Sequence, residues 1–505
     1  MIRPVIFGTQ NGNRYLYSPV RNQIILSHPL VSHFYNIEQE QNDLAPVLAE
    51  AKQKGYLEIE NTGSFPWTEV NYHYRKYKFL KKKGFYSKRK RLNLEGRLHS
   101  SDIDDNITRI KQLIFEVTEE CNLQCTYCTY SKFYVNKERA SREPNLEEIR
   151  NTIRWFLERR NNPDAPLTIS FYGGEPLKNM KLIRELVSAL KSIPGNRVPF
   201  RFSMTSNGVY LKKYIEYLVE HDFEVGISLD GDSTGNAYRL LKNNKPSFDI
   251  VVRNLDYVKE HYPDYFERNI NFMSVMHNRN NYGTVEQFFR EKYNKVPLMS
   301  DINTVGISDE YKSEFYKTFI EHKKDDRYER TPMEQLMLKH PGVKEVAAMF
   351  EVYSGMVFKN HYYMLQPRQN TRFRKKYIPT ATCTPFSMRA FMTTEGKILP
   401  CEHIGREFEI GWADKENVHV DNREITGMFN RYYKKIKTFC DKCYFADNCK
   451  ECMFNTGIEN ERPSCDFFMS QRKFGEYLSR HFSTIENDYP FFLNIAKHAF
   501  RKEGS

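Results

Sequence analysis

From about residue 111 onward, short apolar runs alternate with amphipathic stretches in a regular order. The runs predict buried strands, and stretches such as 248–258, with apolar residues at helical spacing, predict helices. Six strand–helix units with short connections predict a parallel sheet, whose ligands bind at the carboxyl ends of the strands. The predicted strands are Gln112–Val117, Leu167–Phe171, Phe200–Met204, Val225–Leu229, Ile270–Val275 and Ile302–Gly306.

Two helices of this series show N-terminal capping patterns. Asn145 is followed three residues later by Glu148, and Thr284 by Gln287. In a capping box the two side chains each accept a hydrogen bond from the other residue's backbone N–H. We therefore expect helices to begin just after Asn145 and Thr284.

The first 70 residues follow another pattern. Residues 13–18 and 22–27 predict two short strands around a turn. Two helices follow, the second with Pro46 near its start and Gly55 just past its end. Tyr56–Ile59 then alternates like a strand, so this region predicts a small α+β domain.

At 505 residues the chain is too long for one hydrophobic core, and shifts in pattern divide it into six parts. These are a small N-terminal domain (1–70), a basic linker (71–108), the strand–helix series (109–310), a polar helical bridge (311–378), a cysteine-dense segment (379–470) and C-terminal helices (471–505).

The positive charge is concentrated in one tract. Residues 71–100 hold eleven Lys and Arg against one acid, Glu95, and so account for ten of the twelve net positive charges. A local basic block favours an acidic partner, either a nucleic acid or an acidic peptide. A solvated linker explains the same composition equally well.

No stretch reaches the ~18–20 apolar residues that cross a membrane, and the N-terminal residues lack the pattern of a secretory signal. We therefore expect a cytoplasmic protein with no membrane partner. In a reducing compartment, ten cysteines indicate metal ligands or redox chemistry rather than disulfides.

The first cysteine group directly follows the first predicted strand of the series. Cys121, Cys125 and Cys128 lie on one short loop, and three thiolates can hold three irons of a four-iron cluster. The fourth iron then stays open to a small molecule, whereas structural zinc needs four ligands. This Cys-x3-Cys-x-Tyr127-Cys pattern resembles the signature of the radical S-adenosylmethionine (SAM) superfamily.

The resemblance implies a partial (β/α)6 TIM-like barrel and a reaction. In that family the open iron chelates the methionine part of SAM, and one electron cleaves the sulfonium to a 5′-deoxyadenosyl radical that abstracts a substrate hydrogen. A flavodoxin- or ferredoxin-type donor is the expected source of the electron.

Further motifs at the ends of the next three strands resemble the SAM contacts of the same family. The glycine-rich turn after the second strand resembles its GGE element, where glycine backbone and the acid hold the cofactor's ammonium group. The third and fourth strand ends resemble its ribose and carboxylate contacts. The implied cofactor-binding residues are Tyr127, Gly173, Gly174, Glu175, Ser206, Asn207, Ser228, Asp230 and Arg239.

The other seven cysteines form an ordered set that resembles the SPASM extension of radical SAM enzymes, except that Cys449 and Cys452 are separated by two residues where three are usual. The resemblance implies two auxiliary four-iron clusters, three clusters in all. Two Cys-x2-Cys pairs are also typical of zinc sites, which stays the alternative. Glu402 and His403, beside Cys401, are further candidates for a cluster ligand or for the edge of the site. An ordinary role as loop residues explains each of them better. One cluster would use Cys440, Cys443, Cys449 and Cys465, and the other Cys383, Cys401 and Cys452.

Radical enzymes with this extension mostly modify ribosomal peptides or a protein side chain. The region 1–70 resembles the small winged-helix-like leader-recognition elements of peptide maturases, in which a leader adds as a strand to a sheet edge. We therefore expect a maturase that installs a thioether, carbon–carbon or related cross-link in a precursor peptide with a leader.

Two other functions stay open. One is an anaerobic sulfatase-maturase-type oxidase that forms formylglycine in a protein, although the long N-terminal region favours a peptide maturase. The other is a nucleic-acid-binding protein with structural metal sites, which we consider the least favoured.

Overall fold

The computed structural model divides the chain into two compact units. One contains Met1–Arg97, Arg330–Ala381 and Tyr433–Ser505, and the other contains Leu98–Glu329 and Thr382–Tyr432. The residues described are 1–21, 23–41, 43–89, 97–135, 141–162, 164–193, 197–304, 306–322, 357–358, 382–446, 449, 451–456, 465, 468–488, 490 and 500–501.

The second unit is built on a ten-stranded sheet in the order β11-β10-β9-β8-β7-β6-β13-β14-β15-β16. Its first six strands pair in parallel and follow the order of the chain, which confirms the predicted parallel α/β sheet. They are β6 (Gln112–Thr118), β7 (Leu167–Gly173), β8 (Phe200–Ser206), β9 (Glu224–Ser228), β10 (Ile270–Met276) and β11 (Leu298–Asp301).

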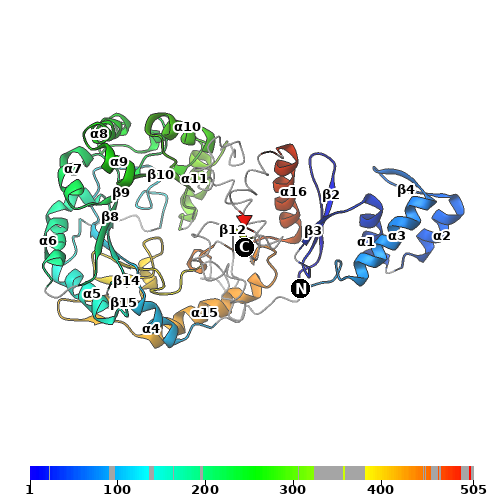
Figure 1. Ribbon diagram of the computed structural model, residues 1–505, viewed down its shortest axis with the longest axis horizontal. Coiled ribbons are helices and arrows are strands. Elements are labelled where there is room, and N and C mark those ends of the chain that lie inside the picture. Colours follow the sequence, from blue (N-terminus) through cyan, green and yellow to red (C-terminus); the bar gives the residue numbers. More distant parts are fainter. Residues whose placement is uncertain are drawn as a thin grey trace. The chain divides into compact units, whose positions relative to one another are not determined.

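Helices connect these strands and lie around the outside of the sheet (Figure 1). Their apolar sides are buried, as Val251, Leu255 and Val258 are on α8, because parallel strands are covered on both faces. The connecting elements are α5 (Leu146–Arg159), η1 (Pro176–Asn179), α6 (Met180–Lys191), α7 (Leu211–Glu220), η2 (Gly235–Tyr238), α8 (Phe248–His261), α9 (Pro263–Asn269) and α10 (Tyr282–Tyr293).

The cysteine-dense segment begins as an extension of the same sheet. β13 (Arg389–Met392) pairs in parallel with β6, and the following strands add as antiparallel neighbours. The remaining elements of this unit are β14 (Lys397–Leu399), β15 (Gly411–Ala413), β16 (Val418–His419), α4 (Ser100–Thr108), η3 (Asp309–Tyr311), α11 (Lys312–Phe319), η5 (Arg406–Phe408) and α15 (Asn422–Cys440), whose last turns belong to the first unit.

The first unit combines a three-stranded antiparallel sheet, a hairpin and helices. Its core joins Leu16 of β2 with Leu30 and Phe34 of α1 and with Val70 and Tyr77 of α3. The elements are β1 (Val5–Gly8), β2 (Arg14–Ser18), β3 (Gln23–Leu26), α1 (Pro29–Gln41), α2 (Ala45–Lys54), β4 (Tyr56–Ile59), β5 (Gly63–Pro66), α3 (Trp67–Lys82), β12 (Val357–Phe358), η7 (Met453–Asn455), α16 (Gln471–Asn487) and β17 (Phe500–Arg501).

The other face of the three-stranded sheet is covered by the C-terminal helix α16. Phe7 and Tyr17 of the sheet pack with Phe474 and Leu478 of the helix. The N–H of Gln10 also donates to the Ser483 hydroxyl over 3.0 Å. The N-terminal sheet is therefore completed by residues near the other end of the chain.

The sixth predicted strand is misplaced in the sequence analysis. β11 ends at Asp301, before the predicted segment 302–306, and pairs through Leu298 with Met273. β11 is an edge strand with a mostly exposed pattern, so it carries no apolar run, and the buried Ile302 just beyond it misled the prediction.

Helix starts show one confirmation and one correction. The Asn145 side chain accepts a hydrogen bond from the N–H of Glu147, which confirms the cap of α5. The second helix begins three residues earlier than predicted, because Asn281 is its N-cap and Thr284 is the N3 partner of the box. The sequence analysis therefore took Thr284 as the N-cap, whereas it is the third residue of the helix.

The helix α3 runs across residue 70, where the sequence analysis ended the N-terminal domain. About half of the expected basic linker is thus helical, in α3 and α4, and residues 90–96 of it lie outside the described residues. Most of the expected bridge 311–378 and the last predicted helix also lie outside them. Among the helices that are described, none has an apolar stretch long enough to span a bilayer.

Candidate functional site

The loop that carries the first three cysteines leaves the carboxyl end of β6. Backbone hydrogen bonds hold it against the segment that follows η2. The N–H of Gln124 donates to the carbonyl of Leu240 over 2.8 Å, and that of Thr126 to the carbonyl of Tyr238 over 3.0 Å. A loop held by backbone hydrogen bonds in this way presents its side chains in a fixed arrangement.

The three thiols of this loop lie near one another. Cys121 is buried, and its sulfur accepts a hydrogen bond from the N–H of Leu123 over 3.4 Å. Burial raises the pKa of Cys125 to about 12. The neighbouring thiols of Cys128 and Cys121 act in the same direction, and Arg239 acts against them. A soft metal that takes the place of the thiol protons would relieve this cost. The donor set fits a four-iron cluster held by three cysteines.

The two glycines at the end of β7, Gly173 and Gly174, let the chain pass directly against this loop. The N–H of Gly174 donates to the carbonyl of Thr118 over 2.8 Å. A Cβ atom on Gly173 would lie 2.1 Å from the oxygen of Thr118, and one on Gly174 would lie 2.1 Å from that of Glu120. No side chain fits there, so both positions require glycine for close packing.

Glu175 follows these glycines and is completely buried. Its carboxylate accepts hydrogen bonds from the N–H of Leu177 (3.1 Å), the hydroxyl of Ser206 (2.8 Å) and the N–H of Asn207 (2.7 Å). All three donors are neutral, and no Lys, Arg or His among the described residues forms an ion pair with it. Burial therefore outweighs the hydrogen bonds and raises the pKa of Glu175 to about 7.

Asn207 connects this carboxylate to the cysteine loop. While its backbone N–H donates to Glu175, its side-chain amide donates to Asn122 over 2.7 Å and approaches the sulfur of Cys121 at 3.7 Å. The ends of β7 and β8 and the loop after β6 thus share one hydrogen-bonded network. The structure brings Cys121, Glu175, Ser206 and Asn207 together as the strand-end rule predicts.

Asp230, after β9, is equally buried but differently paired. Arg239 binds it through two hydrogen bonds of 2.9 Å, the N–H of Val275 adds another of 2.9 Å, and the hydroxyl of Tyr127 adds a fourth. Burial would raise the pKa of Asp230, but Arg239 outweighs it and the pKa is about 2. Its acceptor sites are filled by protein donors. Ser228, two residues earlier at the end of β9, is half-buried and pairs in register with Met273.

His277 belongs to this cluster and was missed in the sequence analysis. It is fully buried directly after β10, with Nε2 3.8 Å from the carboxylate of Asp230. Its Nδ1 accepts the N–H of Arg279, and its ring packs against Tyr238. Asp230 was included through its resemblance to the family's strand-end motifs, whereas His277 could have been found as a polar residue just past the end of a predicted strand.

The model of the Radical SAM superfamily matches residues 115–291, which include the three-cysteine loop and every strand end described above. The chain carries a radical SAM domain. Proteins of this superfamily bind a four-iron cluster and SAM, in agreement with the donor set of the loop.

Curated proteins similar to this chain include two enzymes with assigned activities. The cysteine-type anaerobic sulfatase-maturating enzyme of Clostridium novyi is 28% identical over 225 residues, 42% of this chain and 58% of that protein. The radical SAM cyclopropyl synthase TigE of Paramaledivibacter caminithermalis is 28% identical over 242 residues, 44% of this chain and 47% of that protein. The chain thus matches about half the length of these relatives.

Among solved structures, native anSMEcpe with bound AdoMet covers 76% of this chain and 99% of its own, with 16% identity and a TM-score of 0.47.

An ionic network joins the segment after Cys401, which lies outside the matched residues, to buried glutamates in and just after β6. The guanidinium of Arg406 lies 3.1 Å from Glu116 and 2.9 Å from Glu119. The hydroxyl of Tyr130, two residues after Cys128, donates to Glu116 over 3.3 Å. Nothing in the sequence pointed to this network, because its members lie up to 290 residues apart.

All ten cysteines are free of disulfides, as expected for metal ligands. In the first unit, Cys440 and Cys443 share a turn, and the sulfur of Cys443 accepts the N–H of Met469 over 3.4 Å. That contact brings the segment after Cys465 to the same turn. In the second unit, Cys383 is exposed, and Glu402 beside Cys401 pairs with Arg389 at 3.0 Å. The grouping of these seven cysteines into clusters stays a prediction.

Proposed function

We propose that this chain is a radical SAM peptide maturase with two auxiliary iron–sulfur clusters. Bound to a reduced four-iron cluster, SAM supplies a 5′-deoxyadenosyl radical, which takes a hydrogen atom from a carbon of a precursor peptide. The three-cysteine loop, with Tyr127 in it, would hold that cluster. As the new bond forms, a second hydrogen would leave as a proton and its electron would pass to an auxiliary cluster, so that the product would be a thioether, carbon–carbon or related cross-link.

One observation carries the SAM-binding part of the proposal. Glu175 is a fully buried carboxylate that forms no ion pair with a cation in the described part of the chain, and Asn207 links it directly to the cysteine loop. A buried carboxylate is costly unless it is paired. The ammonium group of SAM would supply the missing charge, and three of the four acceptor sites of the carboxylate are already fixed by neutral donors.

The remaining predicted contacts would act in two ways. Ser206 and Asn207 hold Glu175 in place, so their role towards SAM includes positioning that carboxylate. Asp230 would position Arg239 and Tyr127 rather than touch the ligand, because its four acceptor sites are taken. Gly173 and Gly174 would keep the two loops close enough for both to reach one ligand.

The second cysteine group supports a peptide or protein substrate. Its order resembles SPASM extensions, and Cys443 accepts a backbone N–H, a contact that tunes iron–sulfur clusters. Of the two relatives described above, one is a sulfatase-maturating enzyme and the other is a radical SAM cyclopropyl synthase. The N-terminal part of the first unit would recognise the leader in the manner of winged-helix-like elements, and a flavodoxin- or ferredoxin-type protein would donate the electron.

The first test counts metals and measures cofactor cleavage. Anaerobically reconstituted protein should hold about twelve irons, from three four-iron clusters. With dithionite as reductant it should release 5′-deoxyadenosine from SAM, and the variant Cys121→Ala/Cys125→Ala/Cys128→Ala should release none while it retains about eight irons. Cleavage by that variant would refute the role of the loop, and zinc in place of the other irons would refute the auxiliary clusters.

The second test concerns the substrate. Any short precursor peptide encoded beside this protein is co-produced with it anaerobically and analysed by mass spectrometry. Loss of hydrogen atoms, located by fragmentation to two linked residues, would support cross-linking. Conversion of a single Cys or Ser to an aldehyde would instead support the alternative.

That alternative, a sulfatase-maturase-type oxidase forming formylglycine, is favoured by one finding, the similarity to the Clostridium novyi enzyme. Both candidates require the same SAM site, so only the modified residue separates them. Duplex DNA bound at physiological salt by a protein that cleaves no SAM would favour the nucleic-acid-binding alternative.

A further inference from the structure

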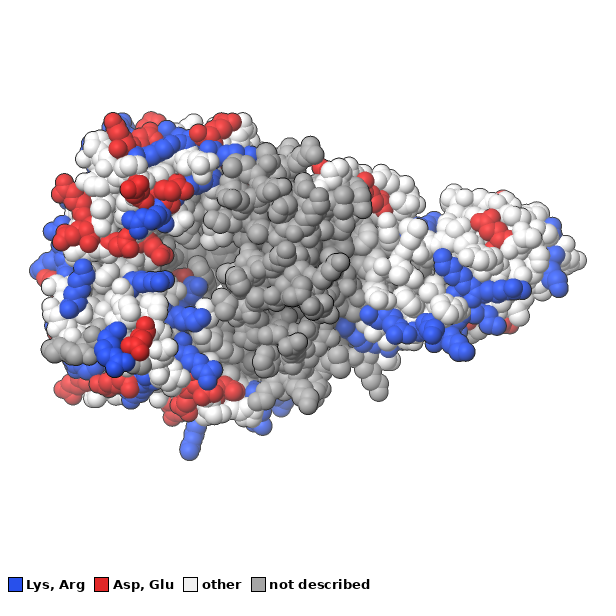
Figure 2. All heavy atoms as spheres, in the orientation of Figure 1, with Lys and Arg blue, Asp and Glu red and all other residues white. Residues whose placement is uncertain are grey.

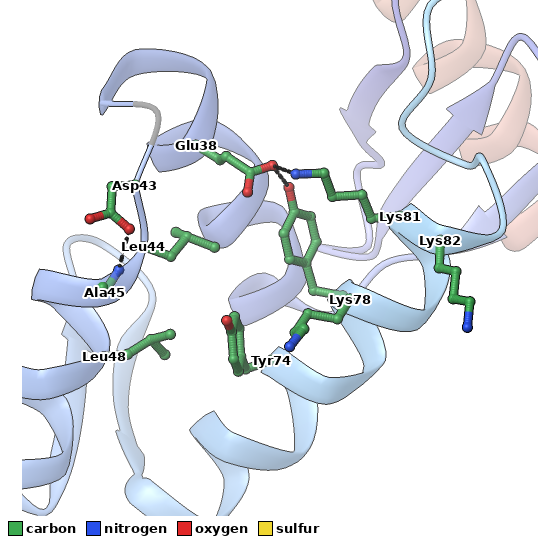
Figure 3. Close-up of a pocket in the computed structure, with 10 residues that line it drawn as sticks. Glu38, Asp43, Leu44, Ala45, Leu48, Tyr74, Lys78, Lys81 and Lys82 are labelled. Carbon is green, nitrogen blue, oxygen red and sulfur yellow. Dashed lines mark hydrogen bonds and ion pairs between the residues drawn. The ribbon is translucent and has the colours of Figure 1, made fainter.

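The first unit contains a groove between the start of α2 and the outer face of α3 (Figure 3). Its volume is about 680 Å³, enough for several side chains of a bound segment. All of its walls lie within the first unit, so the groove does not depend on the second. The lining residues are Glu38, Asp43, Leu44, Ala45, Leu48, Tyr74, Tyr77, Lys78, Lys81 and Lys82.

The floor of the groove is apolar. Leu44 is buried, whereas Leu48 and Tyr74 are half-buried and pack against the core of this unit. The partly exposed faces of these side chains are therefore held by rigid helices rather than by loops. Such a surface gains free energy when an apolar side chain covers it.

The rim of the groove is positive. Glu38 is already engaged, because it accepts hydrogen bonds from Lys81 (2.6 Å) and from the hydroxyl of Tyr77 (2.7 Å). Asp43 likewise accepts the N–H of Ala45 at the start of α2. Lys78 and Lys82 are exposed, and no described carboxylate forms an ion pair with either.

The surroundings reinforce this charge. Helix α3 carries five Lys and Arg and one acid, Glu69. In Figure 2, the right-hand part of the molecule, which holds α3, presents more blue than red on the face in view. An acidic segment would be drawn towards the groove over about 8 Å at physiological salt.

We propose that this groove binds an acidic peptide segment through an apolar side chain on Leu48 and Tyr74 and carboxylates at Lys78 and Lys82. The inference rests on the proposed function, in which the segment belongs to the substrate peptide. It differs from strand addition at a sheet edge, because the contacts are made by helix side chains. Nucleic acid fits less well, since an apolar floor offers nothing to a phosphate backbone.

The test uses full-length reconstituted protein and a fluorescein-labelled synthetic peptide of Asp and Glu with a central Leu-x-x-Leu. Fluorescence anisotropy should show binding that the variant Lys78→Glu/Lys82→Glu weakens at least about tenfold. The matched control Lys52→Glu/Lys76→Glu makes the same change in net charge on α2 and α3 outside the groove, and should bind within about twofold of the parent. Leu48→Ser should also weaken binding, as should replacement of both peptide leucines by serine.

Equal weakening by the two double variants would overturn the proposal, because binding would then follow overall charge alone. Competition by a duplex DNA oligonucleotide at concentrations equal to the peptide would overturn it as well. SAM cleavage by the parent protein without peptide is measured separately. Its absence would refute the proposed function, whereas failed peptide binding by a protein that cleaves SAM would refute only the groove.

Discussion

The ends of β7 and β9 each place one fully buried carboxylate at the same edge of the sheet, yet the pKa of one acid is lowered and that of the other is raised. Arg239 binds Asp230, and the pKa of Asp230 is about 2. Glu175 receives only neutral hydrogen bonds, and burial raises its pKa to about 7. Burial is equal, so the presence of a guanidinium accounts for the difference.

This contrast separates a structural acid from a ligand-binding one. A carboxylate that the protein has already paired holds its neighbours in place. A carboxylate that the protein leaves without a cation, in a domain that binds a cationic cofactor, is prepared for that cofactor. The four predictions below test this distinction, from the largest expected effect to the smallest.

The largest effect should come from Asp230→Asn, because it leaves the buried guanidinium of Arg239 unpaired. We expect a loss of about 3–5 kcal/mol in the free energy of unfolding. Denaturant unfolding followed by near-ultraviolet circular dichroism measures it. The double variant Asp230→Asn/Arg239→Met, which leaves no unpaired charge, should regain part of the loss. Equal instability of the two variants would show that the pair is not the cause.

Glu175→Gln should have the opposite effect on stability. The pKa of Glu175 in the folded state lies above the value of 4.5 in an unfolded chain, so the folded protein retains a proton that the unfolded chain has released. Stability therefore falls as pH rises from about 4.5 to about 7, by up to about 3 kcal/mol, and stays lower above that window. With no SAM present, the Glu175→Gln variant should be more stable than the parent at pH 8 and equally stable near pH 4.5. A lower stability at pH 8 would contradict the absence of a cation.

The same substitution should weaken SAM binding. Loss of one charge-assisted contact lowers affinity about tenfold or more, measured by anaerobic titration calorimetry. For the parent protein, affinity should rise as pH increases through about 7, since only the ionised Glu175 attracts the ammonium group. The affinity of Glu175→Gln should not follow this pH dependence. An identical pH profile for both proteins would place the ammonium group elsewhere.

Ser206→Ala should have the smallest effect. It removes one hydrogen bond of 2.8 Å to the ionised carboxylate, a contribution of about 1 kcal/mol. The pKa of Glu175 should rise further, and the pH at which SAM binding reaches half its limiting affinity should shift upward with it. Thr205→Ser, at the half-buried preceding position, serves as the control and should leave the midpoint unchanged.

The sequence was sufficient to predict five of the six parallel strands, because each carries buried apolar residues between helices of clear periodicity. It also placed Cys121, Glu175 and Asn207 at neighbouring strand ends. It did not distinguish Glu175 from Asp230, since the decisive contact is with Arg239, nine residues further along and across a turn. The edge strands β5 and β11 were missed or misplaced because short, partly exposed strands carry little hydrophobic pattern, and β1 was missed because its apolar run is only three residues long.

The packing of α16 on the N-terminal sheet has a consequence for synthesis on the ribosome. The residues that cover Phe7 and Tyr17 emerge more than 450 positions after them. At about 5–20 residues per second the sheet waits tens of seconds with one apolar face open. During that interval the whole radical SAM domain is made, so it can fold and acquire its cluster before the flanking unit closes.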